Sequence, residues 1–452
     1  MSHDKEVDDN NTWGDVMKPT NSLTLGEKLK QTRIIKGLSQ ENVAFSANSS
    51  ASVISRIERG QLDCPPEMLK RIREYLEIEH APLLDNERDT FLNRLWIWHE
   101  MIATNRFAEA KAACKALSQV TFMPYEQNMS QLYNMIEARL LLSDKNYQAT
   151  IERLNAFEPY VDEADAATLF LYHRNKAVLL VASNDYKDAT SSLLALLEIK
   201  SSEISVDAGV WNLLGYCSMQ LSKPIRAILY YERARADYNF DRTHTLQLSI
   251  NISLASAYVV VGELEQARSL LSAAIHHARG INIIPAACAA LVQFGVICHI
   301  QKNYSEGLNY CEQALEGFLQ DAQEGGKYPN QYKELYIQTL YGKALCLLGL
   351  KRIPQFLQTV DEGKKEAIGS EVYSIIFKAL GHLVNLQDIH SYQYITDTAI
   401  PYLKNCDNIA FKLAAVELCK AIESHFKKRA VKKSLIIAAI IRDIYEEVFR
   451  GL

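Results

Sequence analysis

The side chains that most often carry catalysis or bind metals show no catalytic or metal-binding spacing in this sequence. His99-Glu100 continues to Ala103, where the metalloprotease motif HExxH needs a second histidine. His276 and His277 are adjacent, so on a helix they point about 100° apart and cannot easily share one metal ion. We therefore expect neither an enzyme nor a metal protein, and no cofactor.

The cysteine and glycine patterns also give no sign of a metal site or a phosphate-binding loop. Nine cysteines occur singly between Cys64 and Cys419, and no pair has CxxC spacing. This predicts reduced thiols in a cytosol, mostly as small core residues. The glycine pair at 325–326 is not followed by the GK[ST] of a phosphate-binding loop, which leaves a flexible loop.

Length, composition and net charge are typical of a soluble globular protein. At 452 residues, with 48% hydrophobic and 23% charged residues, the chain is long enough for two or more cores. The net charge of −5 means that any contact with nucleic acid must come from a local basic patch. Residues 1–22 are polar and acid-rich, which predicts a disordered tail and no secretory signal. The longest apolar run, Leu435–Ile441, is far too short to cross a bilayer, so we expect a cytoplasmic protein.

Serines at cap positions and glycines at helix ends predict four short helices between residues 25 and 78. The second helix follows Ser39 and the third follows Ser50. Asn48 lies in the turn between them, where asparagine tolerates the left-handed conformation, and Gly37 and Gly60 end the first and third helices. Apolar residues at helical spacing should face inward: Leu25, Leu29 and Ile34 in the first helix, Val53, Ile54 and Ile57 in the third, and Leu69, Ile72 and Leu76 in the fourth, which opens at Pro65-Pro66.

This stretch resembles the helix-turn-helix of the XRE (Cro/C1-type) repressor family. The resemblance rests on Leu25-Gly26-Glu27-Lys28-Leu29, on Gly37-Leu38-Ser39-Gln40-Glu41-Asn42-Val43-Ala44, and on Val53-Ile54-Ser55-Arg56-Ile57-Glu58-Arg59-Gly60. It implies a DNA-binding domain at 23–80, a linker at 81–90, and a dimer on two half-sites of a palindromic operator.

The resemblance also assigns roles to individual residues. The third helix lies in the major groove, with Ser50, Ala51, Ser52, Ser55 and Arg56 as DNA-binding positions. Gln40 matches the family residue that contacts a phosphate. Arg56 can make a bidentate contact to guanine, whereas Ala51, where many relatives have a long polar residue, can only touch a thymine methyl group. The local positive field is expected from Lys28, Lys30, Arg33, Lys36 and Arg59.

From about Phe91 the sequence is helical and repetitive. Most units are about 40 residues long, and each has a bulky anchor after a short turn and a residue three positions later that is usually small. Six of the seven anchors also have a small residue nine positions earlier. Antiparallel helices need such small residues where they cross closely. The anchors are Phe107, Tyr147, Tyr186, Pro224, Leu264, Tyr304 and Ile353; the residues after them are Ala110, Thr150, Ala189, Ala227, Ala267, Gly307 and Phe356; the earlier small residues are Ala138, Ala177, Gly215, Ala255, Gly295 and Ala344.

These units resemble tetratricopeptide repeats. The fold expected for 91–452 is thus a right-handed α-solenoid of that type, and a HEAT or armadillo solenoid is the alternative. The last segment, Val431–Phe449, is apolar nearly all round. It either packs inside the last turn of the superhelix or forms a dimerisation surface.

In this architecture the first helix of each unit lines the concave face. Counting back from the anchors places a stripe of polar residues there, and an inner row of asparagines suits an extended peptide because each amide offers a donor and an acceptor. Arg174 can clamp a carboxylate. The residues expected to bind peptide are Arg139, Arg174, Asn175, Asn212, Tyr216, Asn251, Gln338 and Tyr341, with Asn134 and Ser256 beside them. The alternative for each asparagine is a bond to a neighbouring helix or to solvent.

An XRE reader fused to tetratricopeptide-like repeats resembles the RRNPP family of quorum-sensing regulators. The resemblance implies a short signalling oligopeptide bound inside the solenoid, which changes DNA affinity in a homodimer. Two other classes stay open: an adaptor that binds a protein partner such as a response regulator, and a constitutive dimeric repressor without a peptide ligand.

Overall fold

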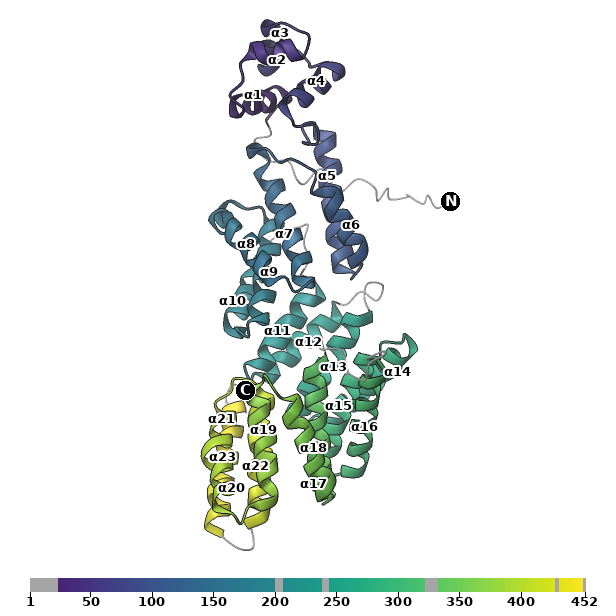
Figure 1. Cartoon of the computed structure of the whole chain (residues 1–452), viewed down its shortest axis with the longest axis vertical. Helices are drawn as coiled ribbons and strands as arrows, with labels where there is room; N and C mark the ends of the chain where they lie inside the picture. The colour runs from purple at the N-terminus through teal and green to yellow at the C-terminus, as the bar shows by residue number, and fades with distance from the viewer. Residues whose placement is uncertain (1–22, 200–205, 238–243, 322–331, 427–430, 450–452) are drawn as a thin grey trace, which may run out of the picture. The chain divides into compact units, whose positions relative to one another are not determined.

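The computed structural model describes residues 23–199, 206–237, 244–321, 332–426 and 431–449, and within these ranges it is helical without a strand (Figure 1). The all-α fold is therefore confirmed. The expected acidic tail at 1–22 and the glycine loop at 325–326 lie outside the described residues. The chain divides into two compact units, Met1–Leu179 with Ile199–Ile204, and Leu180–Glu198 with Ser205–Leu452.

Unit 1 begins with the four expected short helices, α1 (Leu25–Ile35), α2 (Gln40–Ser46), α3 (Ala51–Glu58) and α4 (Pro66–Leu76). The caps are as predicted: Asn42 N–H donates to Ser39 Oγ over 3.1 Å, and Val53 N–H donates to Ser50 Oγ over 3.4 Å. Asn48 is left-handed, with φ of 50°. The caps and the turn together set the angle between α2 and α3.

The core of these helices follows the predicted apolar pattern with one exception. Leu29, Ile54 and Ile72 are almost fully buried, but Ile34 is 56% exposed. The buried face of α1 contains Gly26, Lys28, Leu29 and Thr32. Ile34 follows Leu29 by five positions, which places it about 140° away from that face.

The segment after α4 belongs to the same core. Ala81 and Leu83 are buried with the helix-turn-helix residues, and α5 (Asp85–Ala103) begins two residues later. Met123, from the loop ahead of α7, is 7% exposed and lies in the same cluster, with Tyr125 packed against it. The span 81–90 that the sequence assigned to a linker thus supplies core residues and the start of a long helix.

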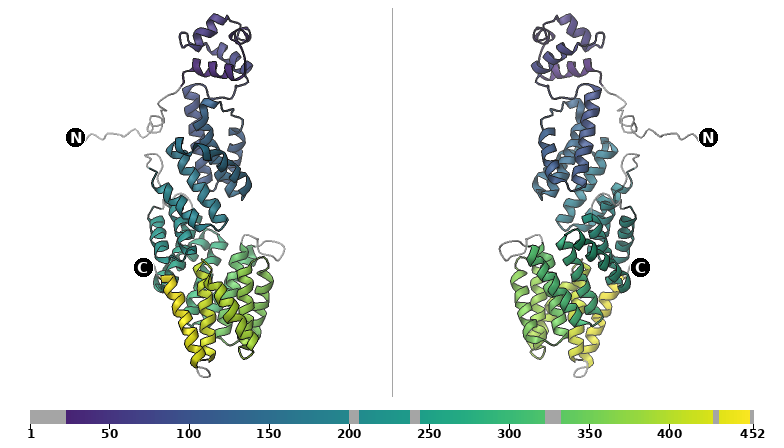
Figure 2. Two further views of the ribbon diagram at one scale, coloured as in Figure 1. Left: turned by 90° about the vertical axis from the view of Figure 1, so that its left-hand side faces the viewer. Right: turned by 90° about the vertical axis from the view of Figure 1, so that its right-hand side faces the viewer.

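The remaining helices of unit 1 are α5, α6 (Phe107–Leu117), α7 (Gln127–Ser143), α8 (Tyr147–Phe157) and most of α9 (Ala166–Ala182), with 3₁₀ turns η1 (Pro124–Glu126) and η2 (Glu158–Glu163). Unit 2 continues in successive pairs that lie side by side (Figure 2). Its helices are α10 (Tyr186–Leu197), α11 (Ala208–Gln220), α12 (Pro224–Ala236), α13 (His244–Val261), α14 (Leu264–Gly280), α15 (Ile284–Ile300), α16 (Tyr304–Asp321), α17 (Lys333–Gly349), α18 (Ile353–Glu366), α19 (Glu371–His382), η4 (Leu383–Asn385), α20 (Ile389–Gln393), the π-helical η5 (Tyr394–Ala399), α21 (Ile400–Lys404), α22 (Ile409–Phe426) and α23 (Val431–Phe449).

Every predicted anchor is the first residue of the second helix in a pair. Two positions before each anchor the backbone is left-handed, which closes the turn between the helices. These turn residues are Asn105, Lys145, Asn184, Ser222, Gly262, Lys302 and Lys351. Their side chains have little in common, and the sequence pattern had not included them.

The small residues of the repeat lie at helix crossings, as predicted. The alanines at both pattern positions are fully buried, and a Cβ on Gly215 would lie 2.5 Å from the Tyr231 ring. Phe356, which departs from the small-residue rule, is also fully buried, so its larger side chain fills the last crossing. The spacing therefore reflects close helix approach.

Unit 2 curves until its first helices meet its last ones. Ser222 Oγ, after α11, donates to the carbonyl oxygen of Asp407, before α22, over 2.6 Å. Asn408 Nδ2 also donates to Gln220 Oε1. These partners are 185 and 188 positions apart in the chain, so the repeats enclose an inner face.

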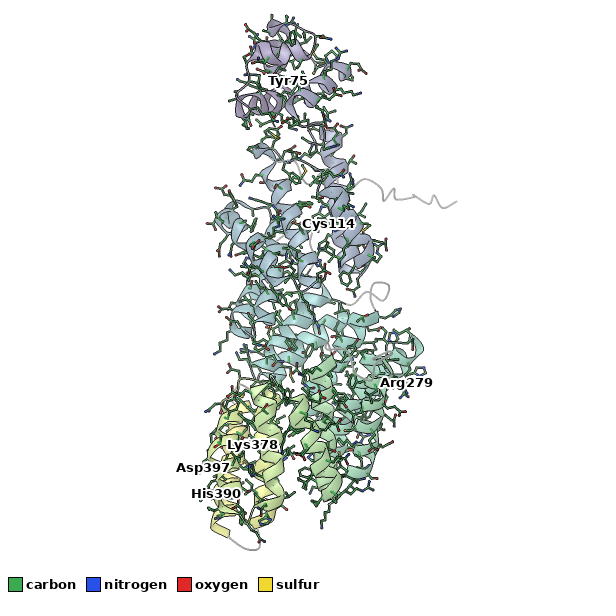
Figure 3. The ribbon with its side chains drawn as sticks, viewed as in Figure 1. Tyr75, Cys114, Arg279, Lys378, His390 and Asp397 are labelled. Atoms are coloured by element: carbon green, nitrogen blue, oxygen red, sulfur yellow. The ribbon has the colours of Figure 1, made fainter. Side chains whose placement is uncertain are left out.

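The C-terminal helices complete unit 2. Lys378 of α19 (labelled in Figure 3) has its Nζ 4.3 Å from the centroid of the Tyr394 ring in η5. In α23 one face is buried through Ile437 and Ile444, while Leu435 is 66% and Ile436 53% exposed. The last helix thus packs inward on one face, as the first interpretation expected, and leaves an apolar pair in solvent.

One described helix, α13, is long and apolar enough to span a membrane by length and composition. It packs against α12, α14 and α15 as the other helices of the stack pack against their neighbours.

Candidate DNA-binding surface and repeat-domain interior

The outward face of α3 presents the predicted DNA-binding positions. Ser52 and Arg56, one helical turn apart, are exposed, and Ala51 and Ser55 beside them are partly exposed. Ser50 is also exposed, with its hydroxyl engaged in the cap. Within the described chain the Arg56 guanidinium has no hydrogen bond or ion pair, so it is available to a ligand.

A buried ion pair fixes α3 against α1 and α2. The Glu58 carboxylate, 3% exposed, accepts from Arg33 Nε over 2.6 Å and from Arg33 Nη2 over 3.0 Å. Gln40 Nε2 donates to the same carboxylate over 2.7 Å, and Arg33 Nη1 donates to the Leu38 carbonyl over 2.9 Å. The hydrogen bond to Glu58 raises the pKa of Arg33. Since the Gln40 amide is engaged, the group it leaves for a phosphate is its backbone N–H at the start of α2.

Three of the five basic residues expected to supply a positive field are not free to do so. Lys28 is 3% exposed and donates to the Leu83 carbonyl over 2.7 Å, and burial lowers its pKa. Arg33 is held by Glu58, and Lys36 Nζ lies 2.8 Å from the exposed carboxylate of Glu77. Lys30 and Arg59 are exposed. The field near α3 therefore comes from fewer charges than predicted, because the amphipathic α1 turns Lys28 and Arg33 inward.

Two of the residues expected to bind peptide in unit 1 connect helices instead. Arg139 of α7 is 8% exposed and hydrogen-bonds His99 of α5. Asn175 of α9 is fully buried, and its Nδ2 donates to the Met135 carbonyl over 2.8 Å. Neither side chain lines an open surface, whereas Arg174 is partly exposed.

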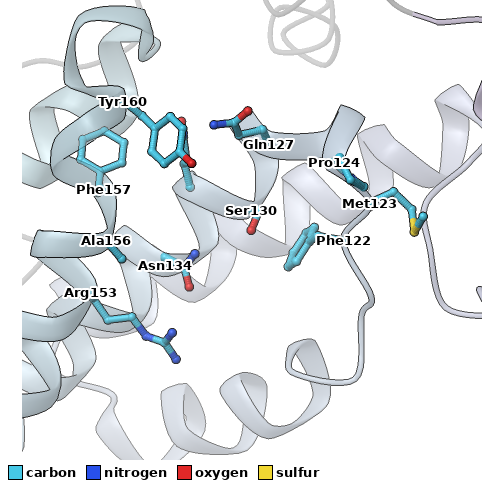
Figure 4. A pocket seen from close by; sticks show the side chains of 11 residues that line it. Phe122, Met123, Pro124, Gln127, Ser130, Asn134, Arg153, Ala156, Phe157 and Tyr160 are labelled. Carbon is cyan, nitrogen blue, oxygen red and sulfur yellow. The ribbon is translucent and has the colours of Figure 1, made fainter. Parts of the chain in front are cut away.

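A pocket of about 410 Å³ opens in unit 1 between the loop before α7 and helices α7 and α8 (Figure 4). Aromatic rings and uncharged polar groups share its wall, which contains Phe122, Met123, Pro124, Gln127, Ser130, Gln131, Asn134, Arg153, Ala156, Phe157 and Tyr160. Arg153 is paired with Glu137 over 2.7 Å. Of these residues the sequence had singled out only Asn134.

The inner face of unit 2 brings together three other predicted residues. Gln338 Nε2 of α17 donates to Tyr373 OH of α19 over 3.1 Å. Tyr216 of α11 is 39% exposed; burial raises its pKa, and the nearby Glu334 charge raises it further. Burial also raises the pKa of Tyr341, and the charge of Glu417 on α22 adds to that rise. Because the five helices α12 to α16 lie between α11 and α17 in sequence, these groups approach each other across the enclosed space.

Sequence reasoning missed Glu334 and Tyr373. Glu334 lies one turn before Gln338 on the same helix, so extending the predicted stripe by four residues would have included it. Asn212 lies one turn before Tyr216, partly buried and with no partner for its Oδ1 among the described atoms, and Asn251 is partly exposed on α13.

A second polar group joins α15 to α22 in unit 2. His299 Nε2 and Glu417 Oε2 lie 2.9 Å apart. Burial opposes protonation of the imidazole, but hydrogen bonds with Cys346 and Glu417 outweigh it and raise the pKa of His299 to about 9. A hydrogen bond from Cys311 and the His299 charge lower the pKa of Cys346 against the effect of burial. His299 thus lies between the Cys346 sulfur and the Glu417 carboxylate, and both contacts favour its protonated form.

Comparisons with known proteins agree with this layout. Residues 29–83 match the family described as Helix-turn-helix. No curated protein sequence matches the chain. Among solved structures, a Rap protein complexed with Competence and Sporulation Factor is similar with a TM-score of 0.65 at 13% identity, covering 80% of this chain and 99% of that one. The apo quorum sensor NprR from B. thuringiensis gives 0.62 at 16%, covering 79% and 99%, and NprR with its cognate peptide NprX gives 0.60 at 15%, covering 80% and 99%.

The chain is thus an all-helical protein with an N-terminal XRE-type helix-turn-helix and a tetratricopeptide-like repeat fold. The fold that the resemblance implied is confirmed, because the Rap and NprR structures share it.

Proposed function

We propose that this protein is a cytoplasmic transcriptional regulator whose affinity for DNA is switched by a short oligopeptide bound on the inner face of its repeat domain. The DNA-binding part of this proposal rests on the exposed face of α3. Arg56 stands exposed and without a partner one turn after Ser52, on a helix whose position is fixed by the Arg33–Glu58 pair. A helix presented in this way fits the major groove, and arginine matches guanine.

The peptide half rests on unit 2. Tyr216, Gln338 and Tyr341 each lie near Tyr373 of α19, on a face enclosed by the hydrogen bond from Ser222 to Asp407. Rings, amides and hydroxyls suit an extended peptide, because its backbone presents both donors and acceptors. The solved NprR structure with its cognate peptide NprX has this fold. Peptide and DNA need only prefer different curvatures of the repeats for a coupling of roughly 1–3 kcal/mol to arise.

The test is electrophoretic mobility of the full chain on the DNA upstream of its own gene, with and without synthetic peptides encoded by the adjacent small reading frame. A peptide-dependent shift supports the proposal and gives the sign of the switch. DNA binding that ignores every peptide removes the peptide half and favours either a constitutive repressor or an adaptor for a protein partner. The homodimer and the palindromic operator remain predictions, and sedimentation of the DNA complex tests both.

A further inference from the structure

The pocket in unit 1 has aromatic walls that are fixed from outside. The Phe122 ring packs against Phe91 and Tyr133, with ring centroids 5.6 and 5.7 Å away. The Phe157 ring, from α8, packs against Tyr172 at 5.1 Å. Because these three neighbours do not themselves line the pocket, the walls are held without a ligand. A preformed cavity of about 410 Å³ has the size of a small-molecule site.

One face of α7 presents uncharged polar side chains to this cavity. They are spaced i, i+3, i+4 and i+7 along the helix: Gln127, Ser130, Gln131 and Asn134. Within the described chain none of these four side chains has a hydrogen-bond partner. Figure 4 shows Ser130 and Asn134 between the Phe122 ring and the residues of α8. Gln131 is only 8% exposed, and a buried amide without a partner is costly unless a ligand satisfies it.

The cavity offers no unpaired charge to a ligand. Of the described residues that line it, Arg153 alone is charged, and its Nη2 lies 2.7 Å from Glu137 Oε2. A charged ligand would lose its hydration there without gaining an opposite charge. Rings and amides together favour a flat, uncharged molecule that stacks on the rings and exchanges hydrogen bonds with the amides.

One wall of the cavity also belongs to the helix-turn-helix core. Met123 lines the cavity and is buried among the core residues of α1 to α4. Two positions later, Tyr125 OH lies 3.1 Å from Oγ1 of Thr32, a fully buried residue of α1. A molecule in the cavity therefore contacts the same loop, residues 122–126, that packs against α1.

We propose that this cavity is a second ligand site, for a small uncharged aromatic molecule that carries an amide or a similar group. Its occupancy stabilises the packing of the 122–126 loop against α1. The site is separate from the peptide site of the proposed function, because all of its residues lie in unit 1.

The first experiment compares four probes on the full chain by saturation-transfer NMR titration. Indole-3-acetamide combines a flat ring system with an amide. Indole-3-acetate and tryptamine keep the ring but carry a negative or a positive charge, and cyclohexylacetamide keeps the amide without the aromatic ring. Indole-3-acetamide should bind at least about 10-fold more tightly than either charged probe, which would bury an unpaired charge. It should bind about 2- to 10-fold more tightly than cyclohexylacetamide, which cannot stack.

Three variants locate the bound probe. Ala156→Trp fills the cavity without removing a buried side chain, because Ala156 is an exposed lining residue. Its control is Asn155→Trp, at the neighbouring exposed position of α8, which does not line the cavity. Asn134→Leu keeps the size of the side chain and removes its amide. Binding of indole-3-acetamide should be lost in Ala156→Trp, weaken about 2- to 10-fold in Asn134→Leu, and stay unchanged in Asn155→Trp.

Hydrogen exchange measures the connection to the helix-turn-helix. Bound indole-3-acetamide should raise the protection of residues 122–134 and of α1. Tyr125→Phe removes the hydrogen bond to Thr32, so the probe should still bind while the rise in α1 becomes smaller.

The ligand site is refuted if no probe binds the wild type, if the charged probes bind as tightly as indole-3-acetamide, or if Ala156→Trp binds it as the wild type does. Should Ala156→Trp lose protection throughout α10–α23, Asn134→Leu decides instead, and unchanged affinity there counts against the site. A rise in protection confined to residues 122–134 would refute the connection to α1. None of these results bears on the peptide-switched DNA binding, which the gel shifts test separately.

Discussion

Removing the Glu58 carboxylate should loosen the DNA-binding helices more than any exposed substitution in the same region. Glu58→Ala leaves the Arg33 guanidinium, 12% exposed, without the partner it contacts at 2.6 Å. Breaking a buried ion pair by deleting one member costs about 3–5 kcal/mol, because the remaining charge stays buried and unpaired. At about 0.05–0.15 kcal/mol per residue, the whole helix-turn-helix domain has a stability of the same order. We therefore expect α1–α3 to open locally in this variant.

Hydrogen exchange of the full chain, followed by mass spectrometry on peptides from residues 25–60, measures that opening directly. The matched control is Glu41→Ala, at an exposed position in the first turn of α2, which should change protection by less than about 0.5 kcal/mol. The double variant Arg33→Met/Glu58→Leu replaces the pair by apolar side chains and should recover most of the loss.

Two outcomes would refute this reasoning. A protection loss below about 1 kcal/mol in Glu58→Ala would mean that the pair is effectively solvated in solution. A double variant as labile as the single one would mean that Glu58 acts through something other than Arg33, with its bond from Gln40 the first alternative.

Three further outcomes follow from the same structure. Gly26→Ala should separate α1 from α3, because the new Cβ would lie 2.1 Å from the Ile57 carbonyl oxygen; overpacking of this kind costs about 1–3 kcal/mol, measured as lost hydrogen-exchange protection in both helices. Arg56→Ala should weaken operator binding in gel shifts by about 1–3 kcal/mol, and unchanged affinity would contradict a guanine contact. The pKa of His299 is raised to about 9 in the folded protein, so the protonated imidazole contributes fully to stability below about pH 6.5. This contribution is lost as the pH rises through 9, and the free energy of unfolding in urea should fall by up to about 3 kcal/mol. Glu417→Gln should flatten that slope, and an identical slope would exclude the pairing.

The parts of this structure that sequence reasoning predicted correctly are those fixed by local chemistry. The caps Ser39 and Ser50 and the left-handed Asn48 depend on neighbours within a few residues, so their types define the turns. The repeat pattern is local in the same sense. Where the two helices of a pair cross, only a small side chain fits, and this fixes the spacing between the anchor and the small residues within that pair. Lys28 departs from the prediction because its burial depends on Leu83, 55 positions away.

The inner face required information that no single repeat contains. Counting from an anchor with an error of one position rotates a helical side chain by about 100°, enough to move a residue from the open face into a helix contact. Asn175, which the sequence placed among the peptide-binding residues, is such a case: its side-chain amide donates to the Met135 carbonyl instead of facing the groove. The approach of Tyr216 to Glu334 has a different origin. Small rotations between successive helix pairs add up along unit 2 until Ser222 reaches Asp407, and this brings the two side chains together. Whatever binds there must therefore be recognised by side chains that only the whole turn of unit 2 brings together, and a ligand that altered the rotation between any two pairs would move them apart.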